Sequence, residues 1–295
     1  MVILLLMLAC GGGERHPSIV QDTRILSIVA DPPEARPGET ISITVLVADP
    51  KLRGVEVLIW TCGLYEGECA ESLMPFNDWA IVTTTHSIDT PRYNAQNPIS
   101  SWLAEQGRVY REVPDDAAEI FEYLNPIPVA MYALACEPGL CPIIDEVREA
   151  REVNSADSDL KERLADPTLW MHTLPMAGVS MAAQQFLVSN EDDDFRNKNP
   201  SFDPRFAQGK EVTIRIPAGG EVEVAFYVDD PNGGRIYAYA YTTMGEFEER
   251  RVKEDDNGIR NWLMAPNQPG EGRVYMVFED RDGGSALWTR GIEVY

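Results

Sequence analysis

The chain has 295 residues, of which 44% are hydrophobic, and it carries a formal net charge of −23 at pH 7. A protein this acidic repels the phosphate backbone, so we expect no nucleic-acid partner; cationic partners, metal ions included, are its natural complement. The length allows one or two domains with cores of their own, and after residues 2–9 the sequence contains no further apolar stretch of membrane-spanning length.

The N-terminal segment has the pattern of a signal peptide. Residues 2–9 form an unbroken apolar run that is too short to cross a bilayer but matches a signal-peptide core. Residues 7–10, Met-Leu-Ala-Cys, resemble a lipobox, and three glycines follow them. The resemblance implies that residues 1–9 are the signal peptide, that Cys10 carries the lipid that anchors the protein to a membrane, and that residues 10–22 are a flexible tether.

Two features of this segment leave alternatives open. An ordinary signal peptide followed by an incidental cysteine has the same appearance. The apolar run also starts directly after Met1, where a signal peptide normally has Lys or Arg. By resemblance to Gram-negative lipoproteins, Gly11 rather than Asp after the cysteine implies the outer membrane. We therefore expect a lipid-anchored protein of the cell envelope, on the periplasmic or the surface-facing leaflet of the outer membrane.

Four cysteines remain once Cys10 is assigned to lipid: Cys62, Cys69, Cys136 and Cys141. An even number in an oxidising compartment predicts two disulfides. Three connectivities are possible, and the local pairs are favoured, each small loop contributing roughly 2 to 2.5 kcal/mol by the chain-entropy estimate. Four thiolates could instead bind one zinc ion, although neither spacing is the tight pair typical of zinc ribbons.

An internal repeat indicates two domains of the same kind. Pro-Gly-Glu leads into residues 41–50 and Gly-Gly-Glu leads into residues 222–231, and each copy continues through a short turn into another strand, at 55–60 or 235–241. In both copies apolar residues, many of them β-branched, occupy every second position. Such a pattern predicts strands that bury one face.

The first domain is predicted over residues 23–190. It carries an insertion at about 86–170 that includes helices, and residues 179–189 form its closing strand. An acidic linker follows at 191–200. The helices predicted in the insertion span residues 117–124, 143–153 and 157–164.

The second domain, residues 201–295, divides into seven alternating segments that turn signals separate every 8 to 12 residues or so. This spacing is typical of an immunoglobulin-type sandwich. The predicted fold class is therefore all-β, with two immunoglobulin-like antiparallel β-sandwiches, the first with a partly helical insertion. The seven predicted strands are 210–216, 221–228, 235–243, 246–252, 259–264, 272–280 and 286–294.

Three phrases support a family resemblance: the opening ILSIVADPPEARPGETISITVLVADP, the linker phrase NKNPSF and the ending VYMVFEDRDGGSALWTRGIEVY. Together they resemble the Ig-like domain lipoproteins of the envelope of myxobacteria and other deltaproteobacteria. The resemblance covers both domains and rests on strand and turn phrases. It implies a fold and a location, and it implies no activity.

No catalytic motif emerges from the sequence. The three histidines, His16, His86 and His172, are scattered, which excludes an HExxH metal site. Ser180 lies in a phrase that superficially resembles a serine nucleophile elbow, but the second glycine is missing and the residue falls in a predicted strand. We expect a protein that is not an enzyme; the alternative is an envelope hydrolase with its site in the insertion.

A row of tyrosines stands out in the second domain. Alternation places Tyr237, Tyr239 and Tyr241 on one face of a strand. Ordinary cross-strand packing explains such a row, and the functional alternative is a platform that stacks on sugar rings or on a partner protein. Exposure of the three rings would separate the two interpretations.

Strand direction predicts an acidic pole in the second domain. Successive turns of an antiparallel sandwich alternate between its ends, so the turns at 228–234, 253–258 and 279–284 share one end, which the linker with Asp192, Asp193 and Asp194 also reaches. The oxygen ligands expected there are Asp229, Asp230, Asn232, Asp255, Asp256, Asn257, Asp280 and Asp282.

A calcium site is one interpretation of this pole, because calcium takes about six to eight oxygens. The cluster is similar in principle to the calcium-rigidified junctions of cadherins. The competing interpretation is that Asp, Asn and Gly are the residues tight turns require. Lys198, Arg235, Lys253 and Arg281 lie nearby in sequence and would neutralise part of the charge.

These observations favour a lipid-anchored structural or protein-binding component of the cell envelope, whose partner is another envelope or surface protein. A calcium-stabilised adhesin and a carbohydrate-binding surface protein are the alternatives. In this hypothesis the two domains extend in series from Cys10, with the acidic pole at their junction.

Overall fold

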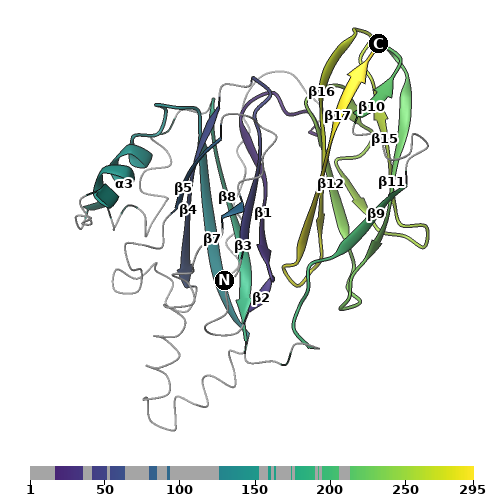
Figure 1. Ribbon diagram of the computed structural model, residues 1–295. Helices are drawn as coiled ribbons and strands as arrows, with labels where there is room; N and C mark the ends of the chain where they lie inside the picture. Colours follow the sequence, from purple (N-terminus) through teal and green to yellow (C-terminus); the bar gives the residue numbers. More distant parts are fainter. Residues whose placement is uncertain are drawn as a thin grey trace.

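The computed structural model describes most of the chain after the N-terminal segment. The described residues are 17–35, 42–51, 54–63, 80–84, 92–93, 126–152, 159–160, 163, 174, 177–189, 192, 195–205 and 213–295. They form two β-sandwiches that stand side by side, with one helix on the outer side of the first (Figure 1).

Two sheets form the N-terminal sandwich. The smaller sheet pairs β1 (Arg24–Asp31) with β3 (Ser42–Ala48), and β3 with β6 (Arg92–Tyr93). Apolar side chains at alternate positions of β3 point into the core against the larger sheet, whose Phe186 is fully buried. The larger sheet has the order β2 (Glu34–Ala35), β8 (Val179–Val188), β7 (Ile127–Cys136), β4 (Val55–Gly63) and β5 (Ala80–Thr84).

Helix α3 (Pro142–Glu152) covers the other face of the larger sheet. Ile144 and Val147 of the helix pack on Leu58 and Leu134 of the sheet, so the sheet is buried on both sides. A disulfide joins Cys136 at the end of β7 to Cys141 just before the helix, with 6.1 Å between the Cα atoms. The connection between strand and helix is therefore short and covalently closed.

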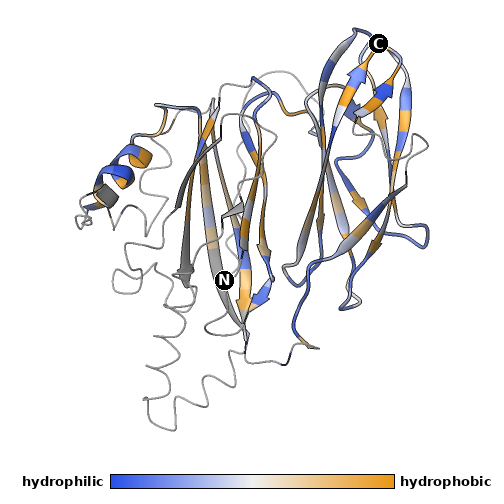
Figure 2. Ribbon diagram, in the orientation of Figure 1, coloured by the Kyte–Doolittle hydropathy of each residue, from blue (hydrophilic) through white to orange (hydrophobic). Residues whose placement is uncertain are grey.

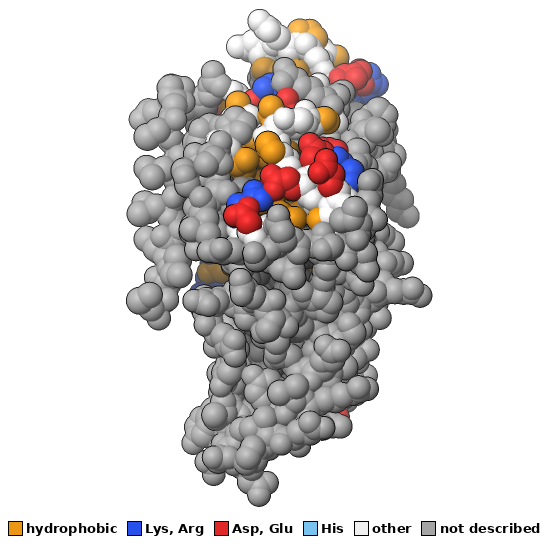
Figure 3. Space-filling model, turned by 90° about the vertical axis from the view of Figure 1, so that its left-hand side faces the viewer, with side chains coloured by type: hydrophobic (Ala, Val, Ile, Leu, Met, Phe, Trp, Pro, Cys, Tyr) orange, Lys and Arg blue, Asp and Glu red, His pale blue; other side chains and the backbone are white. Residues whose placement is uncertain are grey.

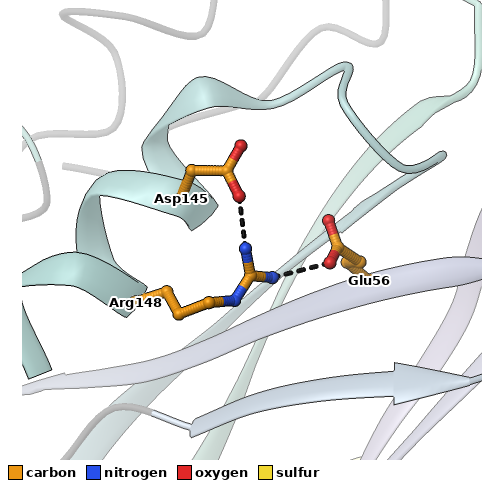
Figure 4. Close-up of polar contacts among 3 residues, drawn as sticks. All are labelled: Glu56, Asp145 and Arg148. Atoms are coloured by element: carbon orange, nitrogen blue, oxygen red, sulfur yellow. Dashed lines mark hydrogen bonds and ion pairs between the residues drawn. The ribbon is translucent and has the colours of Figure 1, made fainter. Parts of the chain in front are cut away.

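An ion-pair triad attaches the helix to the sheet at its polar side. Arg148 of α3 donates to Glu56 of β4 at 2.6 Å and also to Asp145 one turn earlier in the helix (Figure 4). Because Arg148 is about 40% exposed, we expect the triad to orient the helix more than to stabilise it. Acidic and basic side chains lie next to one another on the described part of this side of the molecule (Figure 3).

The C-terminal sandwich also consists of two sheets. Its core is largely aliphatic with aromatic rings among the aliphatic side chains: Phe226 contacts Phe278 and Trp288 edge to face, with ring centroids about 5 Å apart. The five-stranded sheet has the order β10 (Thr213–Ile216), β17 (Ser285–Val294), β16 (Gly270–Glu279), β12 (Tyr237–Thr242) and β14 (Arg251–Lys253). The four-stranded sheet has the order β13 (Glu246–Phe247), β15 (Ile259–Met264), β11 (Glu221–Asp229) and β9 (Ser201–Arg205).

The predicted fold class is confirmed, with three differences in detail. Two pairings are parallel, β10 with β17 and β2 with β8, because in each the chain crosses from one sheet to the edge of the other. Strand β9 lies where no strand was predicted. The single strand predicted at 246–252 is two short strands, β13 and β14, which belong to different sheets.

A buried side chain explains that division. Asn261 of β15 is almost fully buried, and its amide both accepts from the Glu249 N–H at 3.2 Å and donates to the Glu249 carbonyl at 2.6 Å. This pair of hydrogen bonds satisfies the backbone of the residue that passes between the sheets. A strand pattern read locally does not reveal the change of sheet.

Among the helices predicted in the insertion, 143–153 corresponds to α3. Asp159, Leu160 and Arg163, which lie in the helix predicted at 157–164, are helical, and the helix predicted at 117–124 lies outside the described residues. None of the helices in the described part of the chain is long and apolar enough to span a membrane.

The two sandwiches contact each other along a broad apolar interface, and the expectation that they extend in series is wrong. Leu26 of β1 and Leu46 of β3 face outward from the N-terminal sandwich and pack on Tyr241, Tyr275 and Val277 of the five-stranded sheet. Apolar residues alternate with polar ones along many of these strands (Figure 2). Four sheets and α3 therefore stack as successive layers across the molecule (Figure 1).

Candidate functional site

The tyrosine row lies in the interface between the sandwiches. Ala238 and Ala240 point into the C-terminal core and are fully buried, so the tyrosines between them point outward. Tyr241 is only 5% exposed because the N-terminal sandwich covers it, and Tyr239 packs against the same cluster. Tyr239 and Tyr241 therefore do not form a free binding surface, which corrects the interpretation of these two residues as a ligand platform. Tyr237 is half-buried and lies outside this cluster.

Arginines cover the tyrosine rings from both domains. Arg24 of β1 and Arg250 lie over the ring of Tyr241 at 5.5 and 5.7 Å from its centroid, and Arg251 lies over Tyr237 at 4.0 Å. Burial lowers the pKa of the Arg24 guanidinium, and the electrostatic interaction with Tyr241 offsets part of that lowering. Arg24 thus links the two sandwiches by a charged contact that is half-buried.

Tyr275 shows how dry the interface is. It is 1% exposed, and burial raises the pKa of its phenol to about 12. Asp49, a buried residue just after β3, adds to this by its negative charge. The neighbouring Arg273 lowers the pKa in part, so burial is the dominant cause of the rise. Tyr275 is thus as buried as the residues of the two domain cores.

The predicted acidic pole is present in the C-terminal sandwich. The register places Tyr237 opposite both Lys253 and Glu279, and Phe226 opposite Ile259, so the three acidic turns leave their strands at the same end. Asp229 lies opposite Ser201, which brings the linker to that end as well. The sequence argument from strand direction is confirmed at the level of the backbone.

The carboxylates of this pole form turns. The Asp230 side chain accepts from the N–H groups of Asn232 and Gly234 at 2.8 and 2.6 Å, and Asp280 accepts from those of Asp282 and Gly284 at 2.8 Å each. Asp255 does the same one turn away, where its side chain accepts from the Asn257 N–H at 2.7 Å. These are the local side-chain to backbone bonds that favour Asp in tight turns.

Like charges and burial act on the carboxylates of this end. The pKa of Asp280 is raised by burial and by the neighbouring Asp230 and Asp282, and the pKa of Glu254 is raised by burial and by three aspartates. Among the described residues, no group of three or more Asp, Glu, His or Cys is arranged to hold a metal ion. The local hydrogen bonds therefore account for Asp230, Asp255 and Asp280 as turn residues, and the Asn232 side chain bonds the linker backbone at Lys198 and Arg196. Asp229, Asp256 and Asp282 lie in the same three turns, and for them calcium remains a hypothesis.

Asparagines join the linker to both domains at this pole. Asn199 donates to the Ala30 carbonyl of the N-terminal sandwich at 2.8 Å and accepts from the Ser285 N–H of the C-terminal one at 2.8 Å. Asn197 donates through its side chain to the Asp282 carbonyl at 2.9 Å, and its backbone N–H is bound by Glu34 at 2.7 Å. The sequence reasoning treated this stretch as a spacer; the alternating asparagines of NKNP were the signal it missed.

The other candidate residues have structural positions or lie outside the described part. The Ser180 hydroxyl accepts from the Ile25 N–H at 2.9 Å and so connects β8 to β1, which is not the environment of a nucleophile. Cys136 and Cys141 form one of the two local pairs favoured from the sequence. Cys10, Cys69, His16, His86, His172, Asp193, Asp194 and the side chain of Cys62 lie outside the described residues.

One outer sheet face of the C-terminal sandwich is not covered by any described part of the chain. Trp262 of β15 is 41% exposed and Tyr227 of β11 is 37% exposed, on the outward face of the four-stranded sheet. Glu223 lies directly opposite Trp262 in the register, and its carboxylate is 3.8 Å from the Arg260 guanidinium. The sequence contained the signal, because both aromatics occupy outward positions of predicted strands.

No family model matches the chain, and no curated protein matches it. Solved structures do match. The D0–D1 domain of intimin is 11% identical with a TM-score of 0.26, and the match covers 92% of this chain and 98% of that one. The fibronectin(III)-like modules of Clostridium thermocellum CbhA are 10% identical with a TM-score of 0.24, covering 92% of this chain and 93% of that one.

A third match covers a smaller part. A nucleoside hydrolase-related hypothetical protein from Saccharophagus degradans is 9% identical with a TM-score of 0.27, and the match covers 37% of this chain and 34% of that one. The chain thus spans about a third of that protein's length. Similarities at these scores support no functional conclusion, and the function is argued below from the chain's own residues.

Proposed function

We propose that this protein is a lipid-anchored component of the cell envelope that acts by binding another envelope or surface protein, and that it is not an enzyme. Two exposed aromatics on one face of the four-stranded sheet carry the proposal, and the register sets them four positions apart, about 13 Å. Trp262 and Tyr227 are large amphipathic side chains of the kind enriched at the centres of protein interfaces. The pairing of the two sandwiches supports it, because it holds this face on a rigid body.

The charge distribution restricts the partner. The net charge of −23 disfavours nucleic acid. The register places Glu223, Glu246, Glu248 and Arg260 on positions next to Trp262, so three acidic side chains accompany one basic one there. A partner with an apolar patch bordered by Lys or Arg fits this surface best.

Photocrosslinking in intact cells tests the binding surface. A benzophenone side chain placed at Trp262 or at Tyr227 should give an adduct of one defined mass with an envelope protein. The matched control is Glu271, which is exposed at the start of β16 and away from this face; there we expect no adduct. Adducts of equal yield at Trp262 and Glu271, or none at Trp262, would contradict the proposed surface.

The lipid anchor is tested separately. In the parent chain we expect incorporation of a labelled fatty acid and flotation with the membrane fraction. Cys10→Ser should abolish both, whereas a substitution of Gly12 in the same segment should not. An unlabelled parent chain would leave the alternative of an ordinary signal peptide.

Carbohydrate is the second candidate ligand, and the same exposed aromatics favour it. An indole ring stacks on the apolar face of a sugar, and the adjacent Glu223 would accept hydrogen bonds from its hydroxyls. Titration of cell-wall and capsular oligosaccharides, followed by Trp fluorescence, separates the two candidates: saturable quenching that Trp262→Ala removes would favour the sugar.

A further inference from the structure

The segment just before β1 pairs with the C-terminal sandwich, although it is next to the N-terminal sandwich in sequence. Ser18, Ile19 and Val20 precede β1 of the N-terminal sandwich, yet they pair with the C-terminal one. The Thr242 N–H donates to the Ser18 carbonyl at 2.9 Å, and the Val20 N–H donates to the Thr242 carbonyl at 2.8 Å. The two hydrogen bonds make a parallel bridge between Ile19 and Thr242 at the end of β12.

This segment fills a defined position at the edge of the sandwich. Strand β14 pairs with β12 only as far as Tyr239, because the preceding chain has crossed to β13 in the other sheet. The Ala240 N–H still donates to the Arg250 carbonyl at 2.8 Å, and beyond it no described strand of the C-terminal sandwich pairs with Thr242 on that side. The Ser18 hydroxyl also accepts from the Phe247 N–H of β13 at 3.0 Å, so one residue bonds to both sheets of the sandwich.

The segment is buried as deeply as the core. Ser18 is 0% and Val20 is 3% exposed, and the Val20 side chain belongs to the apolar cluster between the sandwiches together with Leu26 and Tyr275. Its contacts are not those of the end of a flexible tether. The tether predicted over residues 10–22 therefore does not extend to its last residues.

The segment gives the two domains a second connection, which is covalent on the side of β1 and hydrogen-bonded on the side of the C-terminal sandwich. Residues 21–23 cross from the segment to β1, and the crossing is held by the ion pair between Asp22 and Lys51. The linker from β8 to β9 crosses at the other end of β1, where Asn199 binds Ala30. The eight residues of β1 are separated by seven steps of about 3.3 Å, so the crossings are about 23 Å apart.

We infer that residues 18–20 act as a strap that locks the two sandwiches in the docked arrangement. A single linker is a hinge about which docked domains open, whereas connections at both ends of the interface forbid the hinge motion until one is released. The strap is the connection that can be released, because the hydrogen bonds that hold it are two between backbone groups and one from the Phe247 N–H to the Ser18 hydroxyl. Its release exposes the tyrosine face. The inference does not depend on lipid at Cys10.

The test uses the full chain and two substitutions in the strap. Val20→Pro removes the N–H that binds the Thr242 carbonyl, and Ser18→Ala removes the acceptor of the Phe247 N–H. Gln21→Ala, an exposed neighbour in sequence, is the matched control. Amide hydrogen exchange of Thr242 and Phe247 reports the strap directly, and spin labels at the exposed Glu149 and Gln268 report the distance between the domains.

In the parent and in Gln21→Ala we expect one narrow distance and slow exchange at both amides. Val20→Pro should add a population at longer distance and make the Thr242 amide exchange about tenfold faster or more, because release of the strap takes the Ser18 carbonyl away from the Thr242 N–H. Ser18→Ala should do the same at Phe247. An unchanged distance distribution in both variants, or unchanged exchange at these amides, would overturn the strap.

Exchange at Ala238 and Ala240 separates opening from unfolding. These amides lie in the same strand β12 away from the strap, and they should remain slow if the sandwich is intact. If these amides exchange fast in Val20→Pro, that variant has unfolded the domain. The milder Ser18→Ala then tests the strap by the same amide exchange and the same distance between spin labels.

Discussion

Both outer faces of the C-terminal sandwich carry aromatic side chains, but one face is covered and the other is exposed. On the five-stranded sheet, Tyr239, Tyr241 and Tyr275 point outward and are covered by the N-terminal sandwich. On the four-stranded sheet, Tyr227 and Trp262 point outward and remain exposed. The difference teaches that alternation along a strand reports the direction of a side chain, and that exposure depends on what another part of the chain does.

The largest effect should come from removing an aromatic ring on the covered face. Tyr275→Ala deletes a fully buried ring, so we expect a loss of about 3 to 5 kcal/mol in the free energy of unfolding. Trp262→Ala on the open face should change it by less than about 0.5 kcal/mol. Chemical unfolding measures both, and equal losses at the two sites would break the comparison.

A smaller loss is expected where the linker joins the domains. Asn199→Ala leaves the Ala30 carbonyl and the Ser285 N–H without their partner, which should cost about 1 to 3 kcal/mol. Asn257→Ala, in an exposed turn of the same pole, is the control and should cost little. If the two variants lose the same stability in thermal unfolding, the asparagine bonds do not contribute and the apolar interface alone keeps the two sandwiches docked.

The cation over the tyrosine row should contribute less again. Arg24→Gln removes the guanidinium from the Tyr241 ring, and we expect a loss of about 1 kcal/mol for a cation–π contact that is largely desolvated. Arg260→Gln on the open face is the matched variant. A double-mutant cycle of Arg24 with Tyr241 would isolate the contact, and a coupling energy of zero would show that Arg24 acts only through packing.

The smallest effect is a pH dependence of stability from Glu279, which lies beside the tyrosine row opposite Tyr237. Burial raises the pKa of this carboxyl in the folded state. The folded state therefore holds the proton more tightly than the unfolded state, so the stability is fully present below the ordinary pKa of a Glu and is lost as pH rises through the raised value. Glu279→Gln should reduce the fall of the unfolding midpoint with rising pH above about pH 4.5, and Glu223→Gln is the control. If the midpoint of Glu279→Gln depends on pH as it does in the parent chain, the assignment is contradicted.

Much of the second domain could be predicted because its strands alternate regularly and its turns carry Asp, Asn and Gly at the required places. The gathering of the turns of Asp230, Asp255 and Asp280 at one pole followed from strand direction alone. The role of those carboxylates did not follow, because the residues that cap a tight turn are also the residues that bind calcium. Only the hydrogen bonds to the N–H groups of Asn232 and Gly284 distinguish the two.

The strap and the crossing strand could not be predicted for a different reason. Ser-Ile-Val at 18–20 is too short to show a period, and residues 246–252 keep a strand-like pattern through the change of sheet. Both depend on buried partners far away in sequence: Ser18 bonds Phe247 across 229 positions, and Asn261 bonds Glu249 across an intervening turn.

By itself the sequence determined the strands, the class of fold, the acidic pole and a cysteine pair that the structure closes. The side-by-side docking, the burial of the tyrosine row and the exposure of Trp262 were decided only in the tertiary structure. The physical reason is that the period of a strand is a local property of the backbone. The free energy of covering a face comes from contacts such as that of Val20 with Tyr275, which no window of neighbouring residues contains.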